Sequence, residues 1–528
     1  MHKKLRTFAV ILITFSLIFG FLIRLFVVLH FTNFTGDQIN DAYRVLGIWK
    51  GSLPTLGPGP TAWTQLGGDI YLPPLYYYLV FPFTAITFDL SSQAIANAVF
   101  TFLSIPLLIF TVYQLLDNIQ PEKRLFLAAV AGFWYSILFR NIVLSTGDSL
   151  AGNPVSMLFF LLIFVLLYTY QLEEKLSPTA EILAWIAYGI SLAILTNLHF
   201  SSLFVMPVVF LGSIIFYITR KPKQKKRWLL AGLSIASALL ALTPYWLGEI
   251  SRNWENTARI VSLAIGASSQ QGYSVTLLQR LNAIIHGYLD LGKDVYFIGN
   301  SWKNIVISLS FFCVILFVGI LKFKGNRTIF FMLMGISIVF LGAYSSTDMT
   351  KTYNPVFYKL LIYLAPLFLT ISSLAYLDLS KKIDKILIAF IIICLTISIL
   401  INLKFHYNYV SGRWTMPRIP NTFDTAQVIE EVPDNSTLCE AVGNYRNLRI
   451  YEYTNQYITK RNLQFSPECQ PGNYYIYEKY ESVGDFTMRQ KQPLAKLLNK
   501  SSRQYQFNVS KDTPLYYIYK VSDRLVRG

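Results

Sequence analysis

Long apolar runs separated by short polar segments dominate the first 405 residues of this chain. Each run is close to the roughly 20 residues that an α-helix needs to cross a bilayer. The pattern predicts eleven transmembrane spans in an α-helical polytopic membrane protein. The spans lie near residues 8–29, 92–116, 124–140, 153–171, 181–198, 200–218, 229–247, 301–321, 328–347, 356–376 and 386–403.

One further apolar segment, residues 71–88, opens with a proline pair and is rich in aromatic residues. We expect a helix that lies in or dips into the membrane interface rather than one that crosses. The loop charges favour this topology, because basic clusters then fall on the side of the N-terminus, which is the cytoplasmic side. Four loops have this charge (117–124, 219–228, 322–327 and 377–385), whereas the loop at 172–180 does not.

Composition agrees with a membrane protein. Hydrophobic residues make up 53% of the chain and charged residues only 14%, against about 25% charged residues in soluble domains. The net charge of +17 lies largely in short loops, where it sets topology, so we expect no nucleic-acid partner. The basic N-terminal flank precedes an apolar core that is too long for a signal peptide, and we interpret it as a retained span. Short loops and basic ends favour a bacterial cytoplasmic membrane.

The chain after residue 405 is too polar to span a bilayer. We predict two units: a transmembrane domain, residues 1–405, and a small α/β or α+β domain outside the cytoplasm, residues 406–528. Strand-like aromatic runs begin at Tyr474 and Leu515. Cys439 and Cys469 lie in this second unit and could form a disulfide in an oxidising compartment, and two unpaired thiols are the alternative.

A polar stretch, residues 35–79, follows the first span and contains three aspartates, Asp37, Asp41 and Asp69. A carboxylate just beyond a span lies where water meets lipid, which suits chemistry on a substrate with a polar head and a lipid tail. Asp37 could act as a general base or help to hold a divalent metal. If residues 36–48 are helical, Asp41 shares its face. The alternative is that one aspartate caps the helix and the other is solvated.

The polar stretch contains a series of short motifs, which are Gly36-Asp37-Gln38, KGSLPTLGPGPT from Lys50, Gly67-Gly68, and PPLYYYL from Pro73. In these motifs the sequence resembles the C-type membrane glycosyltransferases, the superfamily of the protein O-mannosyltransferases and aminoarabinose transferases. Weaker matches are Asn153-Pro154, LTNLHFSSL from Leu195, TPYWLGEISRNWEN from Thr243 and YKLLIYLAPL from Tyr358. They cover roughly residues 1–405, and the tail matches no family.

The resemblance implies a polyprenyl-phosphate-linked sugar donor and an inverting transfer at the outer membrane face. It implies that Asp37 is the catalytic base. Many relatives have a second acidic residue directly after that aspartate, and here Gln38 stands there. A second carboxylate would have to come from Asp41, Asp69, Asp148 or Glu249. Dependence on Mg²⁺ or Mn²⁺ is therefore left open, and no other cofactor is expected.

Other residues are candidates for catalysis or for substrate binding, each beside a plainer alternative. Asp148 could face Asp37 or be a solvated loop residue. Arg252 and Arg259 could bind the donor phosphate through their guanidinium groups, or anchor the interface or pair with an acid such as Glu249. Further candidates are Lys351 for phosphate, Tyr76 for stacking on sugar rings, and His199, which could equally be a packing histidine.

We therefore expect an enzyme that passes a sugar to a lipid, glycan or protein acceptor. An enzyme of similar build that transfers a whole lipid-linked oligosaccharide is the first alternative. A transporter or lipid flippase is the second. Transporters usually carry charges within spans and show internal repeats, and these spans contain few charges and no visible repeat.

Overall fold

The structure, a computed structural model, describes residues 2–31, 36–57, 71–87, 91–139, 141–142, 176–198, 225–266, 296–298, 302–322, 364–411, 422–439, 454–478, 480–482, 488–490, 505–512 and 516–523. It also describes isolated residues between 158 and 166, 207 and 218, 276 and 278, and 448 and 452. Of residues 36–40 the backbone alone is described. Most of these residues are helical, as the apolar runs predict.

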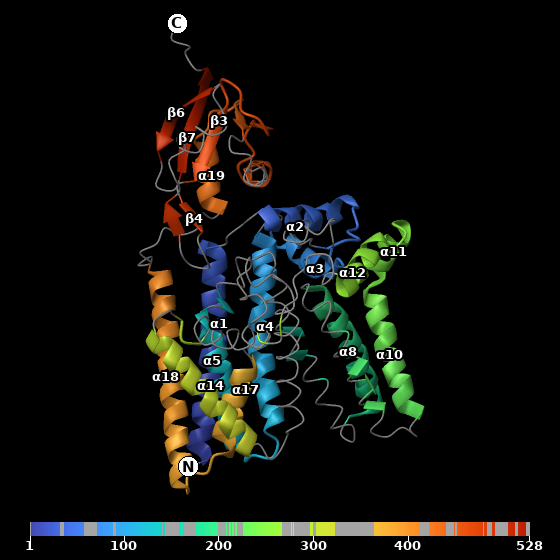
Figure 1. Ribbon diagram of the computed structural model, residues 1–528, viewed down its shortest axis with the longest axis vertical. Coiled ribbons are helices and arrows are strands. Elements are labelled where there is room, and N and C mark those ends of the chain that lie inside the picture. The colour runs from blue at the N-terminus through green and yellow to red at the C-terminus, as the bar shows by residue number, and fades with distance from the viewer. Residues whose placement is uncertain are drawn as a thin grey trace.

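A bundle of long helices forms the lower part of the molecule in Figure 1. Its members are α1 (His2–Phe31), α4 (Ser91–Leu115), α5 (Pro121–Ile137), α8 (Pro178–Leu198), α10 (Lys225–Ala241), α14 (Trp302–Lys322), α17 (Leu364–Tyr376) and α18 (Lys382–Val410). Helix α1 packs against α4 and α5, α8 packs against α10, and α14 packs against α17. Large apolar side chains such as Phe8, Ile11 and Phe15 are exposed on α1, which is the surface that lipid requires.

Among the described residues, four helices are long and apolar enough to cross a membrane, and a fifth candidate is the bent pair formed by α10 and α11 (Thr243–Ser251). The protein is an integral membrane protein. The predicted count of eleven spans is not confirmed, because the span at 328–347 lies outside the described residues and those at 153–171 and 200–218 lie largely outside them. The predicted span at 229–247 corresponds to this bent pair. The helix bends by 59° at a break beside Leu242, where Pro244 lies in the first turn of α11 without an N–H to donate.

Helix α5 stops inside the bundle, and α18 binds the backbone groups that this end leaves free. Leu138 is extended, and the Phe139 amide donates to the side-chain oxygen of Asn402 at 2.8 Å. The carbonyl of Ile137 lies 2.9 Å from Nε2 of His406; since a carbonyl only accepts, Nε2 must carry the proton. Irregular backbone at membrane depth is tolerated only where it is satisfied in this way.

Short helices lie together at the end of the bundle opposite the N-terminus (Figure 1). They are α2 (Gly36–Gly47), η1 (Ile48–Lys50), α3 (Leu75–Val80), η3 (Phe81–Ala85), α11 and α12 (Glu255–Gly266). Helix α3 has six residues and is about 9 Å long, so it cannot cross a hydrocarbon core of about 30 Å. The described residues 71–87 of the segment 71–88 lie at this end of the bundle, and the predicted topology stays a prediction.

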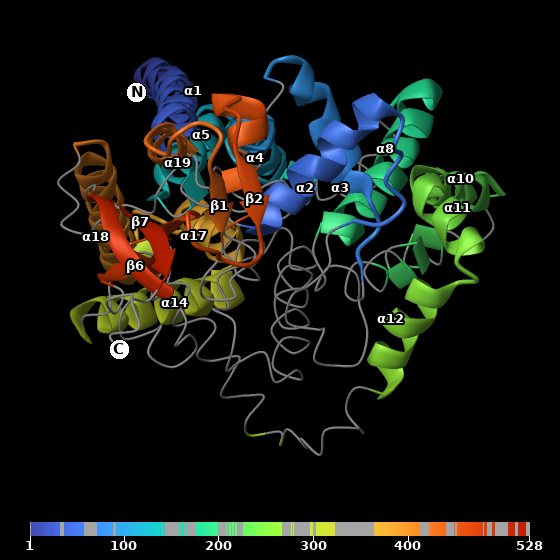
Figure 2. The same cartoon turned by 90° about the horizontal axis from the view of Figure 1, so that it is seen from above.

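The C-terminal part lies above the same end and consists of a helix on a sheet (Figures 1 and 2). Helix α19 (Thr422–Glu430) packs through Val428 and Ile429 against Tyr474, Ile476 and Ile518 of the sheet. Cys439 and Cys469 form a disulfide, so that prediction is confirmed.

The sheet has the order β2-β1-β3-β7-β6, with β1 parallel to β2 and β3, and β7 antiparallel to β3 and β6. A second sheet pairs β4 with β5. The strands are β1 (Thr437–Cys439), β2 (Gln464–Ser466), β3 (Tyr474–Glu478), β4 (Tyr480–Ser482), β5 (Met488–Gln490), β6 (Tyr505–Asp512) and β7 (Tyr516–Asp523), and a π-helix, η7, spans Asn455–Thr459.

Candidate functional site

Helix α2 carries the central candidate residues of the first loop. It spans Gly36–Gly47, so Asp37 and Asp41, four residues apart, lie on one face as predicted. The side chain of Asp37 lies outside the described residues. Asp41 is buried, with 4% of its surface exposed, and its Oδ1 accepts a hydrogen bond of 2.7 Å from the hydroxyl of Tyr77 on α3.

The Tyr77 hydroxyl is a permanent donor to Asp41. Burial and the negative charge of Asp41 together raise the pKa of Tyr77 well above its ordinary value of 10.0, against a smaller opposing effect of Arg44. A tyrosine that stays protonated remains a donor. This bond connects α2 to α3.

Arg44, seven residues after Asp37 and hence on the same face of α2, is held at its guanidinium. Its Nη1 donates to the carbonyl oxygens of Leu56 at 3.1 Å and Gly57 at 2.9 Å. The cation also lies 5.7 and 5.9 Å from the ring centres of Tyr71 and Tyr77, within cation–π range. The side chain is exposed, and it also forms a hydrogen bond with the side chain of Tyr77. A fixed and exposed guanidinium is suited to binding an anion.

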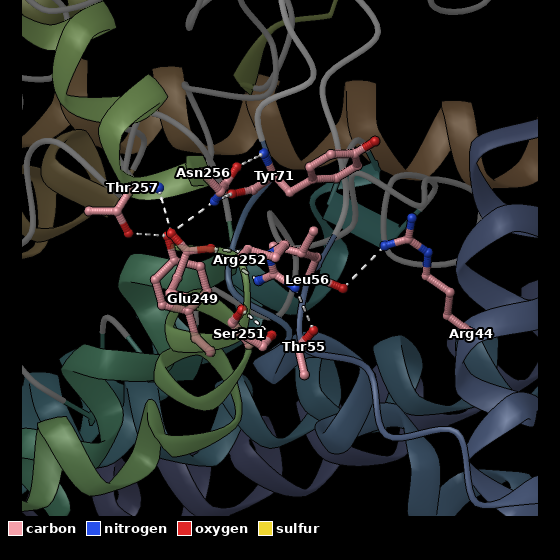
Figure 3. Close-up of polar contacts among 11 residues, drawn as sticks. Arg44, Thr55, Leu56, Tyr71, Glu249, Ser251, Arg252, Asn256 and Thr257 are labelled. Carbon is pink, nitrogen blue, oxygen red and sulfur yellow. Dashed lines mark hydrogen bonds and ion pairs between the residues drawn. The ribbon is translucent and has the colours of Figure 1, made fainter. Parts of the chain in front are cut away.

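The two ends of the first loop run side by side. The Gly57 amide donates to the Leu72 carbonyl at 2.6 Å, and the Tyr78 hydroxyl donates to the Pro54 carbonyl at 2.9 Å. A Cβ at Gly57 would collide with the Pro73 carbonyl oxygen, so only glycine allows this approach. The contacts place residues 55–57 between Arg44 and helix α11 (Figure 3).

Helix α11 contributes an ion pair that binds this loop on the side opposite Arg44 (Figure 3). Nε and Nη2 of Arg252 donate to Oε1 of Glu249 at 3.3 and 3.0 Å, and Nη1 donates to the Thr55 hydroxyl at 2.9 Å. The Thr257 amide donates to Oε2 of Glu249 at 2.6 Å. Burial alone would raise the pKa of Glu249, but these bonds and the charge of Arg252 outweigh it and lower that pKa below its ordinary value of 4.5.

The Asn256 side chain pairs with the backbone of Tyr71 as a neighbouring strand would. Its Oδ1 accepts from the Tyr71 amide at 2.8 Å, and its Nδ2 donates to the Tyr71 carbonyl at 2.9 Å. The preceding residues Asn253 and Trp254 have φ angles of 53° and 62°, a conformation that costs free energy in non-glycine residues. This strained turn brings Asn256 and Thr257 to the loop.

No family model and no curated protein matches this chain. Its structure is similar to that of the aminoarabinose transferase ArnT from Cupriavidus metallidurans in the apo state, with 11% sequence identity, a TM-score of 0.50 and 97% of each chain covered. The chain has the C-type glycosyltransferase fold. At this identity the likeness concerns the fold and not the substrate. It extends past residue 405, so it includes residues of the C-terminal part, where no motif indicated a relationship.

A second solved structure is less similar. The archaeal oligosaccharyltransferase AglB from Archaeoglobus fulgidus, in complex with an inhibitory peptide and a dolichol-phosphate, matches with 12% identity and a TM-score of 0.46. The match covers 87% of this chain and 64% of AglB.

Within this C-type glycosyltransferase fold, the predicted site residues have different surroundings. Glu249 and Arg252 form the ion pair that the sequence left as an alternative. Arg259 pairs with Glu255 on the surface of α12. Tyr76 lies on α3 and is buried in the core. Asp69, Asp148, His199 and Lys351 lie outside the described residues.

Sequence reasoning missed three contributors to this site, namely Arg44, Thr55 and Asn256. The spacing of seven between Asp37 and Arg44 was the available signal for the first, since two helical turns bring both to one face. Thr55 and Asn256 lie within motifs of the resemblance, but they bind residues 197 and 185 positions away, and no local pattern predicts such contacts. The described residues contain no group of three or more His, Cys, Asp or Glu side chains placed to hold a metal ion.

Proposed function

We propose that this protein is a membrane glycosyltransferase that moves a sugar from a polyprenyl phosphate to an acceptor at the outer face of the membrane, with inversion. The observation that carries the proposal is the arrangement on α2. Asp37 shares a helix face with Arg44, whose exposed guanidinium is fixed by the Leu56 and Gly57 carbonyls. The fold shared with ArnT supports this reaction class.

In the proposed reaction, Asp37 accepts the proton of an acceptor hydroxyl or amine as the acceptor atom attacks the anomeric carbon. The bond between that carbon and the phosphate oxygen breaks on the opposite side, which inverts the configuration. The phosphate leaves with the bonding electrons and gains negative charge. The guanidinium of Arg44 would stabilise that charge, because a cation that is already held in place needs no reorganisation during the reaction.

The remaining candidates take supporting roles in this proposal. Asp41 holds α2 on α3 through Tyr77, and Glu249 with Arg252 holds Thr55. Asp69, Asp148, His199 and Lys351 are proposed to bind donor or acceptor, with Asp148 as the second carboxylate. The proposed setting is a bacterial cytoplasmic membrane, with lipid, glycan or protein as acceptor.

The first experiment offers purified protein a panel of radiolabelled polyprenyl-phosphate sugars and a membrane extract. Native protein should release and transfer one sugar. The Asp37→Asn variant should be slower by roughly 10²- to 10⁴-fold, the usual contribution of a general base. Glu255→Gln, which removes an exposed carboxylate on α12, is the matched control and should keep native turnover.

Equal turnover by native protein and Asp37→Asn would contradict the role of Asp37 and direct attention to Asp69 and Asp148. If native protein binds each lipid but neither releases nor transfers a sugar, monosaccharide transfer is contradicted. An oligosaccharide donor or transport would then be favoured.

The role of Arg44 has its own test. Arg44→Lys keeps the charge but loses the planar guanidinium that binds the Leu56 and Gly57 carbonyls. We expect turnover to fall roughly tenfold or more with Asp37 intact. Arg259→Lys, a change in an arginine of the exposed pair, should have no effect, and a native rate for Arg44→Lys would contradict the assignment.

A further inference from the structure

Helix α11 has the reverse of the polarity expected in water. Its buried side carries Tyr245, Gly248 and Glu249, of which Gly248 lies against Thr55 of the first loop. Its exposed side carries Leu247 and Ile250, which are 62% and 60% exposed. Helices of soluble proteins place apolar residues inward, so this helix places its apolar side towards something other than water.

The apolar side continues onto α12. Trp254, Ala258 and Val261 are exposed, and their spacing of four and three residues forms one stripe along the helix. The rings of Trp246 and Trp254 lie 6.0 Å apart. We name Leu247, Ile250, Trp254, Ala258 and Val261 the outer face of α11–α12.

Lipid is the occupant that the surroundings indicate. Helix α10, which leads into α11, exposes leucines along its length, including Leu239 and the 72% exposed Leu240 just before the bend. The outer face therefore continues the lipid-facing surface of a span. The bend of 59° turns α11 away from the direction of α10, towards the plane of the bilayer. Tryptophan is enriched at that depth, and the Glu255–Arg259 pair beside the stripe suits the headgroup region.

We propose that the outer face of α11–α12 lies among the lipids at the membrane interface, and that this contact seats the first loop. The α11–α12 unit is a single layer of helix. A change in how deeply its outer face lies in the bilayer therefore also moves the residues on its inner side. There Arg252 holds Thr55, and Asn256 holds both backbone groups of Tyr71. The bilayer thus acts through α11–α12 on the loop that contains the candidate site, whatever reaction that site performs.

Spin labels test the location. In a background with Cys313→Ala and Cys394→Ala, Ile250→Cys is labelled in the full chain and placed in vesicles of phosphatidylcholine and phosphatidylglycerol. Oxygen should relax this label more strongly than a water-soluble nickel chelate does. Val509→Cys is the matched control, a branched residue of 56% exposure on β6 of the C-terminal sheet, and there nickel should dominate. Nickel relaxation at Ile250 like that at Val509 would overturn the proposal, and so would protection from both reagents, which would indicate a protein neighbour.

Hydrogen exchange tests the connection to the loop. The amides of Tyr71 and Gly57 both donate within the described network, so their exchange rates report whether the loop is seated. Ile250→Asp should speed their exchange in vesicles at least tenfold and leave the amides of α8 unchanged, which also shows that the bundle stays folded. Val509→Asp should change neither. Unchanged protection at Tyr71 and Gly57 in Ile250→Asp would overturn the connection.

Discussion

Replacing Glu249 with glutamine tests whether the buried ion pair holds α11–α12 and the first loop together. The carboxylate accepts two bonds from Arg252 on one oxygen and a bond from the Thr257 amide on the other, and the Thr257 side chain also bonds to it. The glutamine side chain offers a single acceptor oxygen and an NH₂ group, so one partner must face a donor in place of an acceptor. The change adds no volume, and its effect therefore reports on hydrogen bonding and charge.

The size of the effect follows from these contacts. A hydrogen bond to a charged group contributes about 1.5–3 kcal/mol. The side chain of Glu249 is fully buried and that of Arg252 is 27% exposed, so water partly screens the charge that Arg252 is left with. We expect a loss of about 2–3 kcal/mol for the local structure, which corresponds to roughly 30- to 150-fold faster exchange of the Thr257 amide.

Hydrogen exchange of the full chain in lipid vesicles measures this directly. Glu255→Gln is the matched control, because Glu255 forms an exposed pair with Arg259 on the same helix unit and such pairs contribute at most about 1 kcal/mol. The reasoning is refuted if the Thr257 amide exchanges no faster in Glu249→Gln than in Glu255→Gln.

Three further outcomes are expected. The pKa of Glu249 is lowered in the folded protein. The stability that the ionised carboxylate contributes is therefore fully present above the ordinary pKa of 4.5 and is lost as pH falls through the folded-state pKa. Thr257 exchange, corrected for intrinsic rates, should therefore accelerate below that pH in native protein and stay level in Glu249→Gln. Gly57→Ala should cost about 1–3 kcal/mol of thermal stability through overpacking, whereas Gly232→Ala, in open space, should not; equal melting temperatures would contradict the close approach of the loop ends. Cys439→Ser opens a disulfide between residues 30 positions apart and should cost the C-terminal part roughly 3–4 kcal/mol in urea unfolding, and an unchanged midpoint would count against a structural disulfide.

Local periodicity was sufficient for the elements whose partners lie nearby. The spacing of Asp37 and Asp41 predicted a shared face on α2, and the strand-like run from Tyr474 became β3. The same reasoning could not predict the pairing of β3 with β7. Tyr474 pairs with Lys520 across the sheet, and the local sequence of a strand does not indicate which distant strand it will pair with.

The candidate site was harder to predict because its contacts use backbone atoms or distant residues. Arg44 binds the carbonyls of Leu56 and Gly57, groups that every residue possesses. Arg252 had two chemically reasonable partners, a phosphate or Glu249, and only the fold brings Thr55 to its third donor. The bend at Leu242 had a visible cause in Pro244, but the direction of α11 depends on the loop against which it packs.

The end of α5 has a consequence for the order in which the protein can be completed. The backbone groups at this end bind Asn402 and His406 of α18, which follow their partners in the sequence by 263 and 269 positions. At a synthesis rate of about 5–20 residues per second, that interval is roughly 15–50 seconds. During this time the end of α5 already exists while its partners do not. A ribosome-bound chain that stops before α18 therefore holds an unfinished bundle, and the last span to be made completes one of the first.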